Sequence, residues 1–584
     1  MIRIKDHKQR DLFDPWSFLS PKRRQMLDDS WAGLLKEQLL AELPVEQFAS
    51  HFNQGFGRPT KELHTVLGTL LFQQFFDLTD CEAIDQLSFN IQWHYALNIT
   101  EESDSAKYIS PKTLWSMRQL MVELCLDGVV FDQITLKLAT IFDVDTDKQR
   151  IDSVHIKSNM RRLGRISIMA NCIRKFLVNV KRGHKKLFGT IDPAFCERYL
   201  PQKALSAFSM VKPSESAKTL ESVARDLFDL VAQFKDVPET AAMHSYKLMD
   251  RVLHEHCNLV PAENGREVQV KTAKDVPASS LQNPSDPDAS YSGHKGQGYQ
   301  VQVMETFTET EDPEEKSETL NLITHVEVQP AHESDATALI PAIESTQQRG
   351  IGPKKLLADS LYGGDDNCQD AEERGVQVIA PSMGQPKEGR LNLSDFELGK
   401  NGKVTRCPQG HQPIESRKKK TRHSVCFNAE ICSQCPQRDV CPSKPGKKGY
   451  YLRYEEKAAR ISLRRQFEQT EAFINQYRWR AGVEATMSEY DRRTGVKQLR
   501  VRGINAVRFN AMLKACGINI LRAVAVWAAK NAGSRTAKGQ KAGIGLLFGL
   551  IKELFNAIWN FARNIFWRPS FLWVYAHNCH SITF

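Results

Sequence analysis

Apolar residues recur at helical spacing through the first 145 residues, which predicts a helical N-terminal domain. The clearest stripe consists of Leu63, Val66, Leu67, Leu70, Leu71 and Phe75. These positions fall on one face of a helix, as expected for a helix that packs on a core. Gly57-Arg58-Pro59-Thr60 precedes the stripe, so we expect Thr60 to be the N-cap. A second capped helix is predicted from Ser110-Pro111 through Met121.

Later segments have the patterns of strands. The predicted strands are Arg150–Ile156, Tyr299–Met304, Leu322–Val328, Lys354–Asp359 and Gln377–Ala380. The acidic stretch 305–318 is predicted to be an exposed hairpin loop, and 336–348 a helix. Helices are also expected at 166–180, 219–234 and 241–256, followed by a linker at 272–297 rich in Pro, Ser, Asp and Gly. The order βββαβαβ, with a helical block inserted after the first strand, predicts an α/β domain with an RNase H-like mixed sheet.

Composition is that of a soluble globular protein, with 41% hydrophobic and 25% charged residues among 584. We predict a helical domain at 1–145, an α/β domain at 146–525 and a helical tail at 526–584. The α/β domain is expected to contain a helical insertion at about 160–290 and a Cys-rich basic insertion at about 395–450.

The net charge of +10 favours a polyanionic partner, although many soluble enzymes without a nucleic-acid role are equally basic. The N-terminal helices fit an all-α packing domain or a DNA-binding bundle of helix-turn-helix character, and the motifs described below favour the DNA-binding bundle. The basic N-terminal residues are not followed by an apolar core, so we expect no secretory signal. Charges interrupt the apolar stretches 544–555 and 557–566, which are predicted to be amphipathic or core-facing helices. We therefore expect a cytoplasmic, nucleoid-associated protein without a membrane partner.

Two aspartates occupy positions where a carboxylate has no evident packing role. Asp152 interrupts a strand between Ile151 and Val154, where an unpaired carboxylate costs free energy unless it binds something. Asp359 follows a buried apolar strand, at the end where open α/β sheets place ligands. Either residue alone is also compatible with an ordinary turn or cap.

A third carboxylate lies in a helical stretch. Tyr477, Arg480 and Glu484 are spaced i, i+3 and i+7, so they are predicted to share one helix face. Such a face suits contact with a phosphate chain and a metal ion, although a solvated face with an ordinary i,i+4 ion pair is the alternative.

These motifs resemble those of DDE-type insertion-sequence transposases. Ile151–His155 and Ala358–Gly363 resemble the segments with the two catalytic aspartates, and Tyr477, Arg480 and Glu484 match the Tyr-x2-Arg-x3-Glu signature. The resemblance implies that Asp152, Asp359 and Glu484 are catalytic and bind two Mg²⁺ or Mn²⁺ ions. The family often has a lysine seven residues after the glutamate, but this chain has Asp491. Arg492, Arg493 or Lys497 are the possible replacements for that DNA contact.

The resemblance extends over roughly residues 45 to 525, and it includes Gly57–Lys61 and Asn283–Ala289. It implies cleavage of element ends and their joining to target DNA, by a homodimer or higher oligomer on double-stranded DNA. The predicted DNA-binding residues are Lys112, Arg118, Lys418, Lys419, Lys420, Tyr477, Arg480 and Arg492. The alternatives are an RNase H-like DNA nuclease without strand transfer and a non-catalytic DNA-binding regulator derived from a transposase.

Five cysteines lie between residues 407 and 441, a segment with few apolar residues. They are Cys407, Cys426, Cys432, Cys435 and Cys441. Four thiolates, or three with His411, suit a structural Zn²⁺. The basic run 417–423 between them is suited to backbone phosphates. The alternative is a solvated loop with free cysteines.

Overall fold

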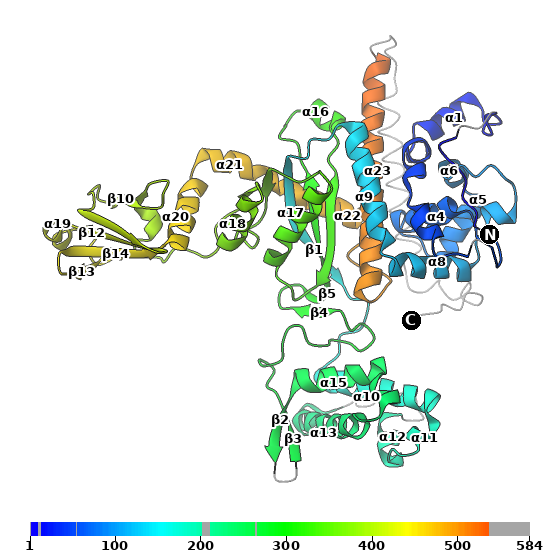
Figure 1. Ribbon diagram of the computed structural model, residues 1–584, viewed down its shortest axis with the longest axis horizontal. Coiled ribbons are helices and arrows are strands. Elements are labelled where there is room, and N and C mark those ends of the chain that lie inside the picture. The colour runs from blue at the N-terminus through cyan, green and yellow to red at the C-terminus, as the bar shows by residue number, and fades with distance from the viewer. Residues whose placement is uncertain (1, 10–12, 54, 201–210, 263–264, 537–584) are drawn as a thin grey trace. The chain divides into compact units, whose positions relative to one another are not determined.

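The computed structural model describes residues 2–9, 13–53, 55–200, 211–262 and 265–536 (Figure 1). The chain divides into two compact units, residues 1–526 and 527–584, and the account below concerns the first. The apolar stretches at 544–566, and most of the tail predicted from residue 526, lie outside the described residues. The predicted domain boundaries within the first unit remain predictions.

The N-terminal region is helical, as its apolar periodicity predicts. Its α-helices are α1 (Pro21–Asp28), α2 (Trp31–Leu34), α3 (Val45–Ala49), α4 (Leu63–Phe75), α5 (Asp80–Phe89), α6 (Ile91–Ala96), α7 (Asp104–Lys107), α8 (Pro111–Glu123) and α9 (Leu126–Phe142). The Ser110 side chain caps α8 as expected. The predicted cap of α4 is wrong, because Glu62 rather than Thr60 accepts hydrogen bonds from the His64 and Thr65 backbone amides. Thr60 Oγ1 instead accepts a hydrogen bond from the backbone of Arg3.

A mixed sheet of six strands forms the centre of the unit. Its strands are β1 (Lys148–Lys157), β4 (Ser290–Ser292), β5 (Gly296–Thr306), β6 (Ile323–Pro330), β7 (Lys355–Leu357) and β8 (Gln377–Ile379). The order is β4-β5-β1-β7-β8, and β6 also pairs with β5. β5 is antiparallel to β1 and β6, whereas β7 is parallel to β1 and β8. Helix α17 (Leu339–Gln348) packs against β6 and against α18 (Asp365–Glu373).

A helical insertion with its own apolar core follows β1. It contains α10 (Arg165–Gly183), α11 (Lys185–Phe188), α12 (Pro193–Tyr199), α13 (Ser216–Phe234), α14 (Pro238–Ala241) and α15 (His244–His256). The hairpin β2 (Cys257–Ala262) and β3 (Gly265–Val270) was not predicted.

The predicted linker at 272–297 is partly ordered by the buried Asp286. This carboxylate accepts hydrogen bonds from Ser158 Oγ at 2.5 Å, Tyr299 Oη at 2.5 Å and the Gly503 backbone at 3.0 Å. It therefore joins the linker to the central sheet and to the segment before the last helix.

The Cys-rich segment belongs to a small β-structure with a core of its own. The structure comprises β9 (Glu397–Leu398), β10 (Val404–Arg406), β11 (Glu415–Lys419), β12 (Arg422–Phe427), α19 (Ala429–Ser433), β13 (Lys444–Gly446) and β14 (Gly449–Glu455). Its buried residues include Phe396, Phe427, Leu452 and Tyr454. The segment 407–441 has few apolar residues of its own, but much of this core comes from the residues that flank it.

The last helices return to the sheet. They are α20 (Glu456–Glu468), α21 (Glu471–Tyr477), a 3-10 turn (Arg478–Ala481), α22 (Gly482–Thr494) and α23 (Ile504–Thr536). The stretch Ile504–Lys530 is long and apolar enough to cross a membrane by length and composition, but most of its apolar window is buried in the protein. Within it, Lys514 Nζ lies 2.8 Å from Asp77, and Asn519 bonds the Ile323 backbone amide at 2.8 Å. We therefore interpret α23 as a core helix.

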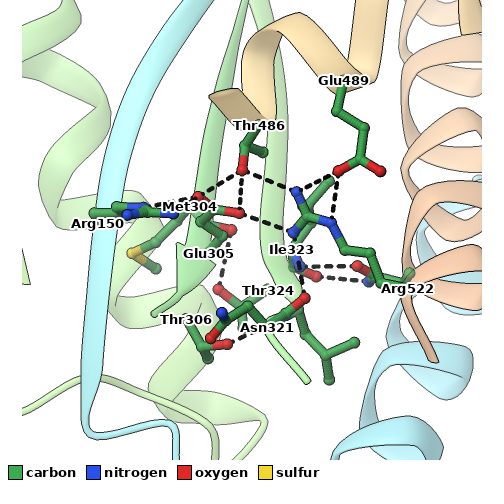
Figure 2. Close-up of polar contacts among 12 residues, drawn as sticks. Arg150, Met304, Glu305, Thr306, Asn321, Ile323, Thr324, Thr486, Glu489 and Arg522 are labelled. Carbon is green, nitrogen blue, oxygen red and sulfur yellow. Dashed lines mark hydrogen bonds and ion pairs between the residues drawn. The ribbon is translucent and has the colours of Figure 1, made fainter. Parts of the chain in front are cut away.

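A fully buried carboxylate, Glu305 at the end of β5, connects these elements (Figure 2). It accepts hydrogen bonds from Arg150 Nε on β1 at 2.8 Å, from Thr486 Oγ1 on α22 at 2.7 Å and from Arg522 Nη1 on α23 at 2.9 Å. The sequence-based assignment of Glu305 to an exposed acidic loop is therefore wrong. Its two arginine partners compensate for the loss of water around the carboxylate.

We expect Glu305→Ala to lower the free energy of unfolding by about 3–5 kcal/mol, because it leaves two buried guanidinium groups without their counter-ion. Urea denaturation followed by circular dichroism measures the change. Glu318→Ala, at an exposed position of the same connection, is the matched control and should change stability by less than about 0.5 kcal/mol. Equal effects of the two substitutions would contradict this assignment.

Candidate functional site

The parallel pairing of β1 and β7 brings Asp152 and Asp359 to the same level of the sheet. Arg150 pairs with Leu357. Asp152 lies two residues after Arg150, and Asp359 lies two residues after Leu357. Both side chains are partly buried, with 17% of the Asp152 side chain exposed. Two carboxylates separated by about 200 residues of sequence thus lie on neighbouring chain segments.

The charge of Asp359 acts on Asp152. Burial raises the pKa of Asp152 above its ordinary value, and the negative charge of Asp359 raises it further. Arg480 opposes both effects, since its Nη2 donates a hydrogen bond to Asp152 Oδ2 at 2.7 Å. The Ser153 amide also donates to Asp152 at 2.8 Å, and the Leu361 amide donates to Asp359 at 2.8 Å.

Arg480 connects Asp152 with the third predicted carboxylate. Its Nη1 lies 3.2 Å from Glu484 Oε1, and 71% of the Glu484 side chain is exposed. The i,i+4 ion pair considered from the sequence is therefore present, but the same arginine also binds Asp152. Within the described residues, Asp152, Asp359 and Glu484 do not form a set of ligand atoms all within 4.8 Å of one another.

The predicted single helix face through Tyr477, Arg480 and Glu484 is interrupted. Helix α21 ends at Tyr477, Arg480 lies in the 3-10 turn, and Glu484 lies in the first turn of α22. Tyr477 stacks on Phe473 with ring centroids 5.2 Å apart. Burial raises the pKa of Tyr477, the positive charge of Arg480 lowers it, and the charges of Asp359 and Asp152 raise it further.

Lys295 and Asp335 lie beside Asp152 and were not predicted. Lys295 Nζ donates to Ser153 Oγ at 2.9 Å and lies 3.7 Å from Asp335. Asp335 also accepts a hydrogen bond from Gln302 Nε2 at 2.8 Å. The available signal for Lys295 was its position between Gly293 and Gly296, whereas Asp335 lies in a turn with no distinctive pattern.

The predicted DNA-binding residues differ in their availability. Lys112, Arg492, Lys419 and Lys420 are exposed. Arg118, in contrast, is engaged within the protein. Its guanidinium donates to Gln73 and Asp80, and only 17% of its side chain is exposed. Lys418 pairs with Glu456. Lys497 Nζ lies 3.7 Å from the carboxylate of Asp491, the residue that stands where the family often has a lysine. The positive charge of Lys497 is therefore close to the position of the missing lysine.

Four of the five clustered cysteines line one small cavity. They are Cys407, Cys432, Cys435 and Cys441, and His411 lies at the same cavity. Burial raises the pKa of Cys432, and the charges of the other three thiols raise it further. Cys426 is buried in β12 and does not line the cavity. Among the described residues, these sulfur atoms do not form a set within 4.8 Å of one another.

Comparison with protein families identifies two regions of the chain. Residues 406–524 match the family described as "Transposase DDE domain". Residues 32–120 match the family described as "Transposase domain (DUF772)". Both regions are therefore similar to families of transposase domains. No curated protein matches it.

The matched regions cover only part of the candidate site. The match at 406–524 contains Arg480, Glu484 and the cysteine cluster, and the match at 32–120 contains Lys112 and Arg118. Asp152 and Asp359 lie outside both matches, so their assignment rests on the register of β1 and β7 and on their shared electrostatics. Transposases of the matched DDE family have an RNase H-like fold, bind DNA and typically use a divalent metal ion.

Proposed function

We propose that the chain cleaves the DNA ends of an insertion element and joins them to target DNA, with Asp152, Asp359 and Glu484 as its catalytic carboxylates. The observation that carries this proposal is the parallel register that puts Asp152 beside Asp359, with Arg480 linking Asp152 to Glu484. The strand order β4-β5-β1-β7-β8, antiparallel between β5 and β1 and parallel from β1 to β8, supports an RNase H-like catalytic domain.

The residues present fit a magnesium or manganese site. All three side chains offer carboxylate oxygens, the donors that Mg²⁺ and Mn²⁺ prefer. When bound, a pair of such ions activates water or a 3′-hydroxyl and stabilises the leaving oxygen. Arg480 favours the ionised form of Asp152 against the effect of burial. Its guanidinium, and the ammonium of Lys295 beside Ser153, are suited to bind DNA phosphates next to the carboxylates.

Two other functions have separate signatures. An RNase H-like nuclease would cut DNA without forming joined products, and a non-catalytic regulator would bind DNA without cutting it. The proposed partners are double-stranded element ends and target DNA, bound by a homodimer or higher oligomer associated with the nucleoid in the cytoplasm. The two family matches favour transposition over both alternatives.

We expect Asp152→Asn, Asp359→Asn and Glu484→Gln each to lower cleavage and joining at least about 100-fold, or about 2.7 kcal/mol in activation free energy. Each variant replaces a negatively charged carboxylate ligand by a neutral amide, which binds the metal ions more weakly. The measurement uses purified protein, Mn²⁺ and a duplex containing the DNA that flanks its own coding sequence. DNA affinity, measured in parallel, should change little.

The control for this experiment is Asp370→Asn, which changes an exposed carboxylate on α18. It should cleave and join DNA at the wild-type rate. Full activity of any triad variant would contradict that residue's role. Cleavage without joined products in the wild-type protein would favour the nuclease alternative.

The turn between β11 and β12 is the proposed phosphate-binding surface. Lys419 and Lys420 are exposed there, whereas Arg417 pairs with Glu415 and Lys418 pairs with Glu456. Lys420 has a positive φ of 52°, which orients the turn and tolerates asparagine. The two lysines outside these ion pairs are therefore the best candidates for DNA contact.

We expect Lys419→Gln/Lys420→Asn to make the slope of log K against log salt less steep by about 1.8, where K is the association constant for DNA. Two phosphate contacts are lost, and each contributes about 0.9 to the magnitude of the slope. Fluorescence anisotropy with duplex DNA at several salt concentrations measures the slope. Arg118→Gln is the comparison, since its guanidinium already bonds Asp80, and it should leave the slope unchanged. An unchanged slope in the double variant would exclude this turn from the DNA interface.

The cysteine cavity is the proposed site of one structural Zn²⁺, held by Cys407, Cys432, Cys435 and Cys441. Thiolates favour zinc, and the four side chains converge from three separate parts of the segment. Tetrahedral binding requires the sulfur atoms to approach one another more closely through side-chain rotation. Cys426 has no part in this proposed set.

Replacing Cys432 and Cys435 by Ser should lower the zinc content by about one equivalent per chain, because serine is a poor zinc ligand. Elemental analysis of the purified protein measures the content. The matched control is Cys426→Ser, which alters a buried thiol of the same β-structure and should retain the ion. Loss of zinc from both variants, or from neither, would contradict the proposed ligand set.

A further inference from the structure

Three potential metal ligands meet at the start of α4, in the N-terminal helical region. They are His7, Glu62 and His64, and each offers a ligand atom within 4.8 Å of the other two. His64 Nδ1 lies 3.0 Å from Glu62 Oε1, and the two imidazole rings lie edge to face with centroids 4.5 Å apart. No other set of three such groups occurs among residues 2–9, 13–53, 55–200, 211–262 and 265–536.

Backbone pairing brings His7 to this position. The Arg3 carbonyl accepts a hydrogen bond from the Leu63 amide at 3.0 Å, and the Lys5 amide donates to Glu62 Oε1 at 3.2 Å. Arg3 and Glu62 also form an isolated parallel β-bridge. The N-terminal segment 2–9 is therefore held along the chain that enters α4, with His7 directed toward His64.

Packing alone does not explain His7. Both of its ring nitrogens are buried and neither has a hydrogen-bond partner. An imidazole that loses its contact with water and gains no hydrogen bond in exchange is disfavoured. Burial lowers the pKa of His7 to about 4, so the ring is neutral near pH 7 and keeps a lone pair for coordination.

We propose that His7, Glu62 and His64 bind a divalent transition-metal ion of the zinc or cobalt type, with water completing the coordination. Two imidazoles with one carboxylate are a donor set that such ions accept, whereas Mg²⁺ prefers oxygen donors alone. Hydrogen bonds from His64 and Thr65 help to hold the pKa of Glu62 at about 2, so its carboxylate is ionised at neutral pH. The site is therefore chemically distinct from the carboxylate triad and from the cysteine cavity.

The ion would fasten the N-terminal segment to the transposase domain matched at 32–120. Glu62 and His64 belong to that matched region and His7 does not. Glu62 also caps α4 through the His64 and Thr65 amides, so the ion and the helix share one carboxylate. Metal binding would then order the segment 2–9 and stabilise the first turn of α4 together.

The test titrates Co²⁺ and Zn²⁺ into the full chain carrying Cys432→Ser/Cys435→Ser, in buffer with millimolar Mg²⁺ to occupy oxygen-only sites. We expect one site with cobalt d–d absorption and no thiolate charge-transfer band. His7→Ala should weaken the affinity for Co²⁺ by more than roughly 100-fold. Loss of a residue that only contacts a metal ligand usually has a smaller effect. Zn²⁺ should also slow trypsin cleavage after Lys8 in the parent chain but not in the variant.

Two further variants separate metal binding from folding. His7→Phe keeps an aromatic ring in the half-buried position without a ligand atom, so it should fold normally and bind no ion there. His51→Ala, at an exposed histidine of the same helical region, should bind as the parent does. Equal affinity in the parent chain and His7→Phe, or no cobalt site in the parent, would overturn the proposal.

Discussion

The buried Glu305 carboxylate is the interaction on which the geometry of the candidate site depends. Arg150 binds it from β1, the strand that contains Asp152, and Thr486 binds it from α22, the helix that contains Glu484. A charge that is fully removed from water requires partners with defined geometry. The strand and the helix therefore cannot shift independently, and the distance between their carboxylates is fixed by a residue outside the site.

Arg150 extends this control to the turn before Glu484. Its Nη1 donates to the Trp479 carbonyl at 2.7 Å, inside the 3-10 turn that contains Arg480. A Cβ on Gly482 would lie 2.0 Å from the same Nη1 atom, so only glycine fits there without displacing the guanidinium. Glycine is therefore required at position 482 by the packing of Arg150 from β1, and not by contact with DNA.

Much of the sheet could be predicted from the sequence because alternation and apolar runs are local signals. Arg150–Ile156 and Lys354–Asp359 are examples, and the parallel pairing of β1 and β7 brings Asp152 and Asp359 to the same level of the sheet. Glu305 could not be predicted, since an acidic stretch begins a few residues after it, at Glu309, and its partner Arg522 lies 217 residues away. A run of charges indicates solvent exposure on average, but it does not reveal a partner supplied by a distant helix.

The same limit applies to the interrupted helix and to the cysteines. Spacing predicted that Tyr477 and Glu484 share one helix face, but α21 ends at Tyr477 and a 3-10 turn separates it from α22. Composition of 407–441 indicated no core, yet Leu452 and Tyr454 supply one from the adjacent strand. The count of five cysteines could not exclude Cys426, because its position in β12 depends on pairing with β14.

Arg480 reconciles the two interpretations that the sequence left open. An i,i+4 ion pair with Glu484 is present, but it does not make the face an ordinary solvated one, since the same guanidinium binds Asp152. Burial disfavours ionisation of Asp152, and the negative charge of Asp359 adds to this cost. The positive charge of Arg480 offsets this cost at Asp152. A metal site built from carboxylates needs a positive charge beside its acidic groups in the same way. The arginine in the Tyr-x2-Arg-x3-Glu segment therefore stabilises the arrangement of the carboxylates as well as offering a contact for phosphate.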